Sequence, residues 1–438
     1  MRRSALLALT ASVIGIVLAV SGAFAWVGSD PEAPPPPVTG MDPAALATAN
    51  DLDAVVASLQ DRLHTQPADA PAWATLGVAY VEQARLTGDP TYYPKAAGAL
   101  RRSLAEQPDD NAPALAGRAA LAAARHQFGR ALQASRAALR INPYELGALA
   151  VRVDALTELG RYSMALDALA QADRRRPGLP VFARYSYARE LHGRTGEAAE
   201  LLRRALSSAS APADRAYLLT LLADLDRQAG RLGVAGAALS AALRSDPGNL
   251  AAQASQARLA VARGELDQAA RRWRDLVSAA PLPEYVLALG ELYDATGRDA
   301  AARAQYRVLE ATARVARSSG VDTALETAHY QADHGSAAKA LTAARAAYGS
   351  ASSIWAADAL AWALHRSGRD RAALQLAREA TRLGTPDALL WIHRGGIEAA
   401  LGDEVSAARH LRRGLSYDPG LSVWQARQAR RVLAAVTR

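Results

Sequence analysis

The chain has 438 residues, half of them hydrophobic, no cysteine and a formal net charge of +8. The lack of cysteine excludes disulfides, thiolate metal sites and the acylated cysteine of a lipoprotein. Only three residues are Phe and three are Met, so a core must be built mainly from Ala and Leu. Arginine supplies 49 of the 51 basic residues, which together with the alanine content suggests a bacterial genome rich in G and C.

Residues 1–28 have the pattern of a signal peptide or an N-terminal transmembrane anchor. Arg2 and Arg3 precede 23 uncharged residues, which as a helix would extend roughly 35 Å and cross a bilayer. The charges on either side of this stretch orient the N-terminus toward the cytoplasm. Ala23-Phe24-Ala25 also fits a cleavage site. We expect an extracytoplasmic protein, either anchored to the cytoplasmic membrane or secreted; the alternative is a buried apolar helix in a cytosolic protein.

A proline-rich linker is predicted at residues 29–41, where Pro34 to Pro37 are consecutive. Such a run favours a stiff, extended spacer that holds the following domain away from the membrane. Residues 42–67 are expected to form an N-terminal capping half-repeat, with Val55, Leu59 and Leu63 on its apolar face.

From residue 68 to residue 420 the chain repeats with a period near 34 residues. In one copy, residues 159–177, Gly160 opens a turn between two helices, Ala165 lies on the second helix, and Pro177 ends it. Equivalent alanines follow one another at spacings of 33 to 38 residues: Ala96, Ala131, Ala165, Ala198, Ala235, Ala269, Ala302, Ala340, Ala373 and Ala407. Twelve residues before these alanines, from the second repeat on, eight of nine positions are small: Ala119, Val153, Ser186, Ala223, Ala257, Gly290, Ala328, Ala361 and Gly395.

This order of glycine, alanine and proline resembles the tetratricopeptide repeat (TPR) family. The resemblance implies an all-α fold, a right-handed α-solenoid of about ten helix hairpins, closed by a C-terminal capping helix at residues 421–438. The first repeat fits only with seven additional residues around Thr87-Gly88-Asp89-Pro90, which we expect to form a protruding loop.

The sequence lacks the common local signatures of catalysis and metal binding. Neither lysine stands in a phosphate-binding loop, and no dinucleotide, zinc-protease, serine-hydrolase or calcium-loop pattern occurs. His365 and His393 belong to different repeats and could meet only through stacking of repeats. We therefore expect no enzyme activity, no catalytic residue, no cofactor and no metal.

In TPR proteins the first helix of each repeat lines a concave groove, and the resemblance implies the same here. The candidate groove residues are acidic or aromatic: Tyr187, Tyr217, Asp224, Glu284, Glu291, Asp294, Asp322, Trp355, Asp358 and Trp362. We expect a non-catalytic scaffold that binds a positively charged peptide or protein segment in this groove. Because Trp355 and Trp362 are seven residues apart, they share one helix face and, with Asp358, could form an aromatic anchor. The alternative for Trp355 is packing against the neighbouring repeat.

Arginine pairs such as Arg101-Arg102, Arg203-Arg204 and Arg412-Arg413 fall on the second helices, whose outer face is convex. They are either solvated helix faces or contacts for anionic lipid head groups or cell-wall polymers. The alternative function is therefore a basic-surface protein that binds nucleic acid or an anionic polymer. Nucleic acid is disfavoured because the arginines are dispersed over convex faces.

Overall fold

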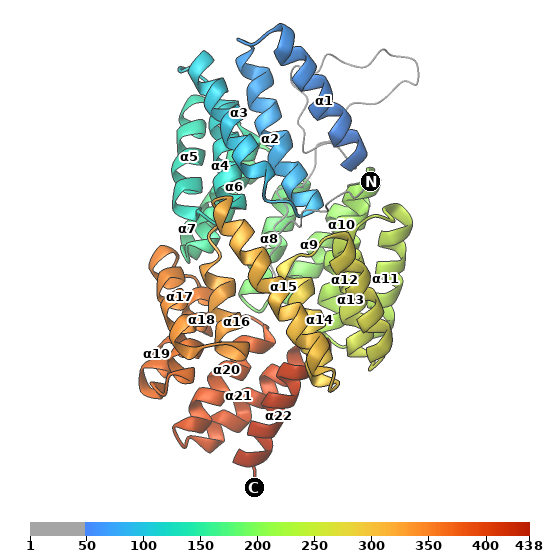
Figure 1. Ribbon diagram of the computed structural model, residues 1–438, viewed down its shortest axis with the longest axis vertical. Helices are drawn as coiled ribbons and strands as arrows, with labels where there is room; N and C mark the ends of the chain where they lie inside the picture. Colours follow the sequence, from blue (N-terminus) through green and yellow to red (C-terminus); the bar gives the residue numbers. More distant parts are fainter. Residues whose placement is uncertain (1–48) are drawn as a thin grey trace.

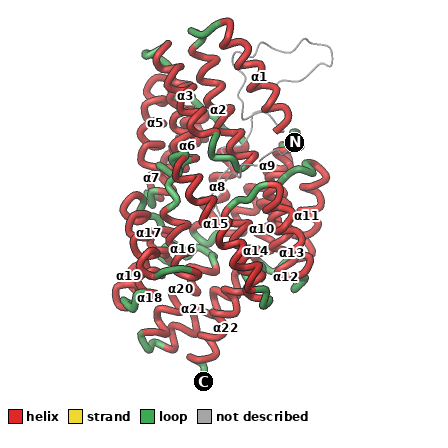
Figure 2. Tube along the Cα trace, viewed as in Figure 1, coloured by secondary structure: helices red, strands yellow, loops and turns green. Residues whose placement is uncertain are grey.

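The computed structural model describes residues 49–438, and these residues form twenty-two α-helices without a strand (Figures 1 and 2). Ten consecutive pairs of helices are antiparallel hairpins, preceded by α1 (Ala49–Thr65) and followed by α22 (Val423–Val436). The prediction of an all-α solenoid of hairpins is confirmed.

The first helices of the ten hairpins are α2 (Ala70–Thr87), α4 (Ala112–Ala124), α6 (Leu146–Glu158), α8 (Leu179–Leu191), α10 (Pro212–Gln228), α12 (Leu250–Ala262), α14 (Pro283–Ala295), α16 (Ala324–His334), α18 (Ile354–Arg366) and α20 (Ala388–Ala400). The second helices are α3 (Tyr92–Glu106), α5 (Phe128–Ile141), α7 (Tyr162–Arg175), α9 (Thr195–Ser208), α11 (Leu232–Ser245), α13 (Leu266–Ala279), α15 (Asp299–Ser318), α17 (Ala337–Ser350), α19 (Asp370–Ala380) and α21 (Glu404–Tyr417).

Small residues set the distance between the two helices of a hairpin. All ten of the periodic alanines are buried, none exposing more than 6% of its surface. At Gly395 of α20, a Cβ would lie 2.8 Å from the Leu411 side chain and 3.1 Å from the Ala407 carbonyl oxygen, so a larger residue would push α20 away from α21. The alternation of alanine and small residues therefore specifies how closely each pair of helices packs.

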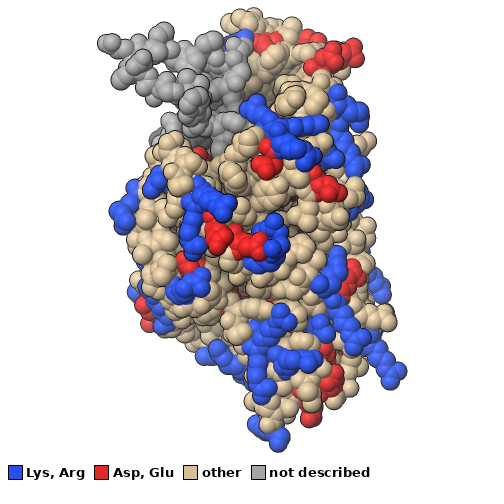
Figure 3. All heavy atoms as spheres, turned by 180° about the vertical axis from the view of Figure 1, so that it is seen from behind, with Lys and Arg blue, Asp and Glu red and all other residues tan. Residues whose placement is uncertain are grey.

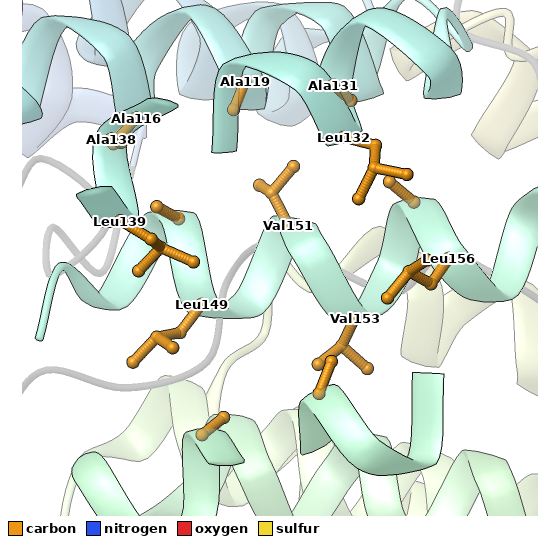
Figure 4. Close-up of a cluster of buried hydrophobic side chains, with 14 of the residues drawn as sticks. Ala116, Ala119, Ala131, Leu132, Ala138, Leu139, Leu149, Val151, Val153 and Leu156 are labelled. Atoms are coloured by element: carbon orange, nitrogen blue, oxygen red, sulfur yellow. The ribbon is translucent and has the colours of Figure 1, made fainter. Parts of the chain in front are cut away.

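The core between hairpins is made of aliphatic side chains, as the composition predicts. Figure 4 shows such a cluster, in which Ala119 of α4, Leu132 of α5 and Val151 of α6 point into one shared space. Val153 and Leu156 extend the same cluster along α6. Burying a Leu or Val side chain stabilises the fold by about 1.5–3 kcal/mol, so each repeat is held mainly by its contacts with its neighbours.

The solenoid coils tightly enough for its second turn to rest on its first. Four successive hairpin turns, after α4, α6, α8 and α10, contact the loops that follow the hairpins five places later. The Gln127 side chain donates to the Gly320 carbonyl (2.8 Å), and the Ile354 amide donates to the Tyr162 hydroxyl (2.9 Å). The Thr385 hydroxyl donates to the Leu191 carbonyl (2.6 Å). We call this line of contacts between the two turns the seam.

The extra residues of the first repeat are part of this closure. Gly88 is buried, and a Cβ there would lie 2.8 Å from the side chain of Leu282, which precedes α14. The expectation of a protruding loop is wrong, because the returning second turn covers it. The long helix α15 also contacts the first turn, because its Ala316 packs, together with Val321, in the apolar cluster of the first hairpins.

The segments expected at 1–28 and 29–41 lie outside the described residues, as does the start of the half-repeat expected at 42–67. Within residues 49–438, no helix is both long enough and apolar enough to cross a membrane.

Candidate functional site

The two turns surround a cavity of about 1820 Å³ that is partly open to solvent. This volume exceeds the roughly 300–1,000 Å³ typical of small-molecule pockets. Its wall is formed mainly by the first helices α8, α10, α12, α14 and α16, together with α15 and α17. The end of α2, the start of α20 and the residues before α22 complete it.

The cavity wall is acidic although the chain as a whole is basic. Eleven Asp and Glu residues line it, against six Lys and Arg. By contrast, Figure 3 shows an outer face on which Lys and Arg side chains are spread widely, with Asp and Glu among them. Charge is therefore segregated, with carboxylates gathered inside and arginines distributed outside.

Glu190 and Asp387 are two cavity carboxyl groups whose pKa values are raised by their surroundings. Burial, reinforced by Asp224 and Asp387, raises the pKa of Glu190 to about 7. Burial also raises the pKa of Asp387 to about 7, with Asp358 and Asp418 adding to the effect. Asp387 is held in place because it caps α20, accepting hydrogen bonds from the amides of Leu389 (2.9 Å) and Leu390 (3.2 Å).

Arg227 is the cation closest to this group of acids. Its side chain is 4% exposed and forms ion pairs with Asp224 (3.4 Å) on the same helix and with Asp418 across the seam. Asp224 in turn accepts a hydrogen bond from the Ser255 hydroxyl (2.9 Å). Because Arg227 is paired with Asp224 and Asp418, it does not neutralise the other carboxylates nearby. The net charge in this part of the cavity therefore stays negative.

Six of the ten candidate groove residues line the cavity: Tyr187, Tyr217, Asp224, Glu284, Glu291 and Trp355. Glu291 is already engaged, since its carboxylate lies 3.0 Å from Nε2 of His334. Burial raises the pKa of Tyr217 to about 12, so its hydroxyl remains a neutral donor and acceptor. Trp355 is 8% exposed and packs in an apolar cluster with Tyr187 as well as reaching the cavity.

The other four candidates lie elsewhere. Asp358 is buried and pairs with His393 (2.9 Å), while the Trp362 indole stacks on the same imidazole at 4.2 Å. Asp294 lies beside the Tyr306 hydroxyl. Asp322 belongs to the seam, where its carbonyl contacts the His126 imidazole at 3.1 Å. Trp355 and Trp362 share a helix, but the structure does not bring them together in one site.

The sequence interpretation did not include several residues of the cavity wall, notably Glu326, Asp387 and Asp418. Asp387 and Asp418 sit in loops between repeats, and only the inner face of the first helices was assigned to the groove. A signal was present: the longest spacing between periodic alanines, 38 residues, spans α15 and the loop that reaches the first turn. The insertion in the first repeat and this long spacing both lie where the two turns meet.

The described residues offer no evident cation-binding centre. Between residues 49 and 438, no group of three or more His, Asp or Glu side chains could hold a metal ion. His329 lies in the cavity wall, and burial lowers its pKa, so its imidazole is neutral near pH 7.

Helix hairpins that recur with a period near 34, with an alanine and a small residue where the two helices meet, have the organisation of tetratricopeptide repeats. The described residues therefore have a fold like that of tetratricopeptide repeats. No family model matches its sequence, and no curated protein matches it either.

Several solved structures are similar to this chain. The TPR protein TTC0263 of Thermus thermophilus is 25% identical, with 37% of this chain and 87% of that chain covered and a TM-score of 0.34. A tetratricopeptide repeat protein from Parabacteroides merdae is 19% identical, with 59% and 98% covered and a TM-score of 0.33. Human IFIT1, solved as a dimer with m7Gppp-AAAA, is 15% identical, with 84% and 86% covered and a TM-score of 0.47.

Proposed function

We propose that this protein is a TPR-type, non-catalytic scaffold that holds a positively charged peptide or protein segment inside its cavity. The observation that carries the proposal is the partly open, acidic cavity of about 1820 Å³. A helix roughly 11 Å across, rising about 1.5 Å per residue, would fill this volume with about a dozen residues. The occupant is therefore a short segment of a partner rather than a folded domain.

The cavity wall supplies both kinds of contact that such a segment needs. Glu190 and Asp224 can pair with a Lys or Arg side chain away from bulk water, where charge pairing is stronger. Tyr217, Leu221 and Trp355 offer apolar and aromatic surface next to these carboxylates. Aromatic residues in desolvated positions are the usual energetic centres of protein interfaces.

We also propose that the scaffold works on the outer side of the cytoplasmic membrane, tethered by or released from its N-terminal segment. The support is the sequence pattern of residues 1–28, with two arginines before 23 uncharged residues. Protease treatment of intact cells should degrade the solenoid. Full protection of the chain until the cells are lysed would contradict an outer location.

The binding proposal is tested by filling the cavity. Ala288 of α14 lines the cavity, whereas Ala372 of α19 is exposed and lies outside the cavity wall. In cross-linking pull-downs from intact cells, Ala288→Trp should lose the partner that the unmodified chain captures, and the matched Ala372→Trp should retain it. Equal capture by both variants would move the site out of the cavity. Recovery of nucleic acid or an anionic polymer in place of protein would instead support the basic-surface alternative.

A further inference from the structure

The junction between α15 and α16 differs from every other junction between the described hairpins. Elsewhere, the second helix of one hairpin packs closely on the first helix of the next. The helices α15 and α16 do not pack in this way, and large side chains bridge them instead. The Tyr330 hydroxyl of α16 donates to the Glu310 carboxylate of α15 (3.2 Å). The Tyr306 ring of α15 lies 5.8 Å from the Tyr330 ring and 4.6 Å from the His334 imidazole.

The sequence explains why this junction is wider. Tyr330 follows Ala328, the small residue of its first helix, by two positions and is 9% exposed. In the other repeats that carry this small residue, the same position is aliphatic: Leu121, Ala155, Ala188, Leu225, Leu259, Leu292, Ala363 and Ile397. An aromatic ring needs more room than Ala or Leu in a closely packed contact. The Tyr330 ring therefore holds α16 away from α15.

The resulting gap opens from the cavity between two outer helices, which lie on either side of α16 (Figure 1). The α15 wall consists of Leu309, Glu310, Ala313, Arg314 and Arg317. The α17 wall consists of Ala338, Lys339, Thr342, Ala343 and Ala346. Both sets have the offsets one, four, five and eight, which keep side chains on one helix face over about 12 Å. We call this space the outer groove.

The floor of the outer groove is aromatic and nearly buried, whereas its walls are open to solvent. Tyr330 and His334 of α16 line the floor, and the His334 side chain is only 4% exposed. On the α17 wall, Thr342 is exposed and Ala343 is half-buried. Apart from Lys339, that wall carries only Ala and Thr, and small side chains allow another helix to approach closely.

The two rims of the outer groove carry positive charge. Arg314 on the α15 wall and Lys339 on the α17 wall are exposed, and neither forms an ion pair with another described residue. Arg317, one turn after Arg314, is also exposed and donates a hydrogen bond to the Thr323 hydroxyl (3.2 Å). These cations are available to a carboxylate that comes from outside the described residues.

The carboxylates next to the outer groove are already engaged. Glu310, the single acid of the two walls, accepts the hydrogen bond from Tyr330. Glu291, which reaches the floor, lies 3.0 Å from Nε2 of His334. The walls of the outer groove therefore have a net positive charge, whereas the cavity as a whole is acidic.

The chain itself places an additional helix at another part of this junction. The C-terminal helix α22 packs against both α14 and α20. Its Trp424 ring lies 4.5 Å from the His334 imidazole, and Val423 packs against the apolar cluster that contains Leu289 and Leu292 of α14. The wide junction thus accommodates a helix beside α14, and the outer groove offers a second position of this kind.

We propose that the outer groove binds an acidic amphipathic helix of a protein partner. The apolar stripe of this helix packs on Tyr330 and on the small residues of the α17 wall, as amphipathic helices do in grooves. Carboxylates on its two flanks pair with Arg314 and Lys339, so complementary charge sets the choice of partner. This interaction does not depend on the positively charged segment proposed for the cavity.

The probe is a fluorescent peptide of about 14 residues, stapled as a helix, with Leu and Ala along one face and Glu on both flanks. The full-length chain should bind it saturably in fluorescence anisotropy, and added salt should weaken the binding because exposed charges are screened. Because the chain has no cysteine, Thr342→Cys introduces a single thiol. Bound probe should slow maleimide labelling of Thr342→Cys but not of Ala372→Cys on the exposed face of α19. Absence of saturable binding, or equal protection at both positions, overturns the proposal.

Charge reversal separates the outer groove from the general charge of the surface. Arg314→Glu/Lys339→Glu should weaken probe binding roughly tenfold or more, because two attractive charge pairs become repulsive. The control Arg371→Glu/Arg378→Glu changes the net charge equally at exposed positions of α19 and should bind the probe as the unmodified chain does. An equal loss in both double variants would show that only overall charge matters, which also overturns the proposal.

Filling the outer groove gives a second test that does not change the charge. Ala343→Trp should abolish probe binding, whereas Ala372→Trp on α19 should retain it, with circular dichroism confirming the helix content of both. Full binding by Ala343→Trp would move the site elsewhere. Dimerisation of the unmodified chain that Ala343→Trp abolishes would assign the outer groove to a second copy. Tighter binding of a single-stranded oligonucleotide, lost in Arg314→Glu/Lys339→Glu, would assign it to nucleic acid instead.

Discussion

Tyr162 and Ala165 lie one turn apart on α7 but belong to two different interfaces. Ala165 is buried among aliphatic side chains of the neighbouring hairpins. The Tyr162 hydroxyl accepts a hydrogen bond from the Ile354 amide, 192 residues further along the chain. The first interface recurs in every repeat and is mainly aliphatic. The second joins two turns of the solenoid and combines side-chain hydrogen bonds with apolar contacts.

This difference separates what builds the protein from what shapes its cavity. Contacts between neighbouring hairpins bury aliphatic surface, whose contribution to stability varies little with pH. The seam contains single hydrogen bonds and an ion pair between Arg227 and Asp418, whose contribution is electrostatic. Substitutions in the first interface should lower the stability of the fold, while substitutions in the second should mainly open the cavity.

The largest loss of stability should come from a buried ion pair between neighbouring hairpins. Asp154 accepts hydrogen bonds from Nε (2.8 Å) and Nη2 (2.6 Å) of Arg184, and both side chains are buried. Asp154→Asn leaves the arginine charge buried without compensation, at a cost of about 4 kcal/mol. Urea denaturation followed by circular dichroism measures it. The exposed Asp167 of α7 is the control, and an equal effect of Asp167→Asn would show that burial is not the cause.

A cavity in the aliphatic core should cost somewhat less. Leu169 of α7 is 1% exposed, and Leu169→Ala should lower the free energy of unfolding by about 3 kcal/mol. Leu166 on the same helix is 38% exposed, so Leu166→Ala should have a much smaller effect. If both variants melt at the same temperature, the repeat register assigned to α7 is incorrect.

At the seam, Tyr162→Phe should cost only about 1–2 kcal/mol, because it leaves the buried Ile354 amide without its acceptor. Its effect on the local contact between the two turns should be larger than its effect on global unfolding. Hydrogen exchange at the Ile354 amide should accelerate. Tyr144→Phe, at a position 59% exposed, is the matched control. Unchanged exchange at Ile354 would argue against a contribution of this hydrogen bond to closure.

The smallest effect is expected on the outer surface. Arg298 and Asp267 form an ion pair at 3.0 Å, with side chains 50% and 79% exposed. Asp267→Asn should change the free energy of unfolding by less than about 1 kcal/mol, and salt should remove the difference. A larger change in urea denaturation at low and high salt would show that the outer charges contribute more than their exposure allows.

The sequence predicted the hairpins well because their determinants are local. Ala165, its equivalents and the small residues twelve positions before them appear at the predicted buried positions. The candidate site was harder to predict. Tyr187, Tyr217 and Trp355 reach the cavity, but Asp322 belongs to the seam and Asp358 is paired with His393. A helical register gives the direction of a side chain, but it does not say which distant element will meet that side chain.

By itself, the sequence determined the number of hairpins, their internal packing and the basic character of the outer helices. These features follow from contacts between residues less than about 40 positions apart, which recur with the period of the repeat. Only the tertiary structure decided that the groove curves around a partly open cavity, since a small rotation at each repeat accumulates over the array. After five hairpins the accumulated rotation brings the Leu191 carbonyl to the Thr385 hydroxyl, and no local pattern in the sequence encodes that meeting.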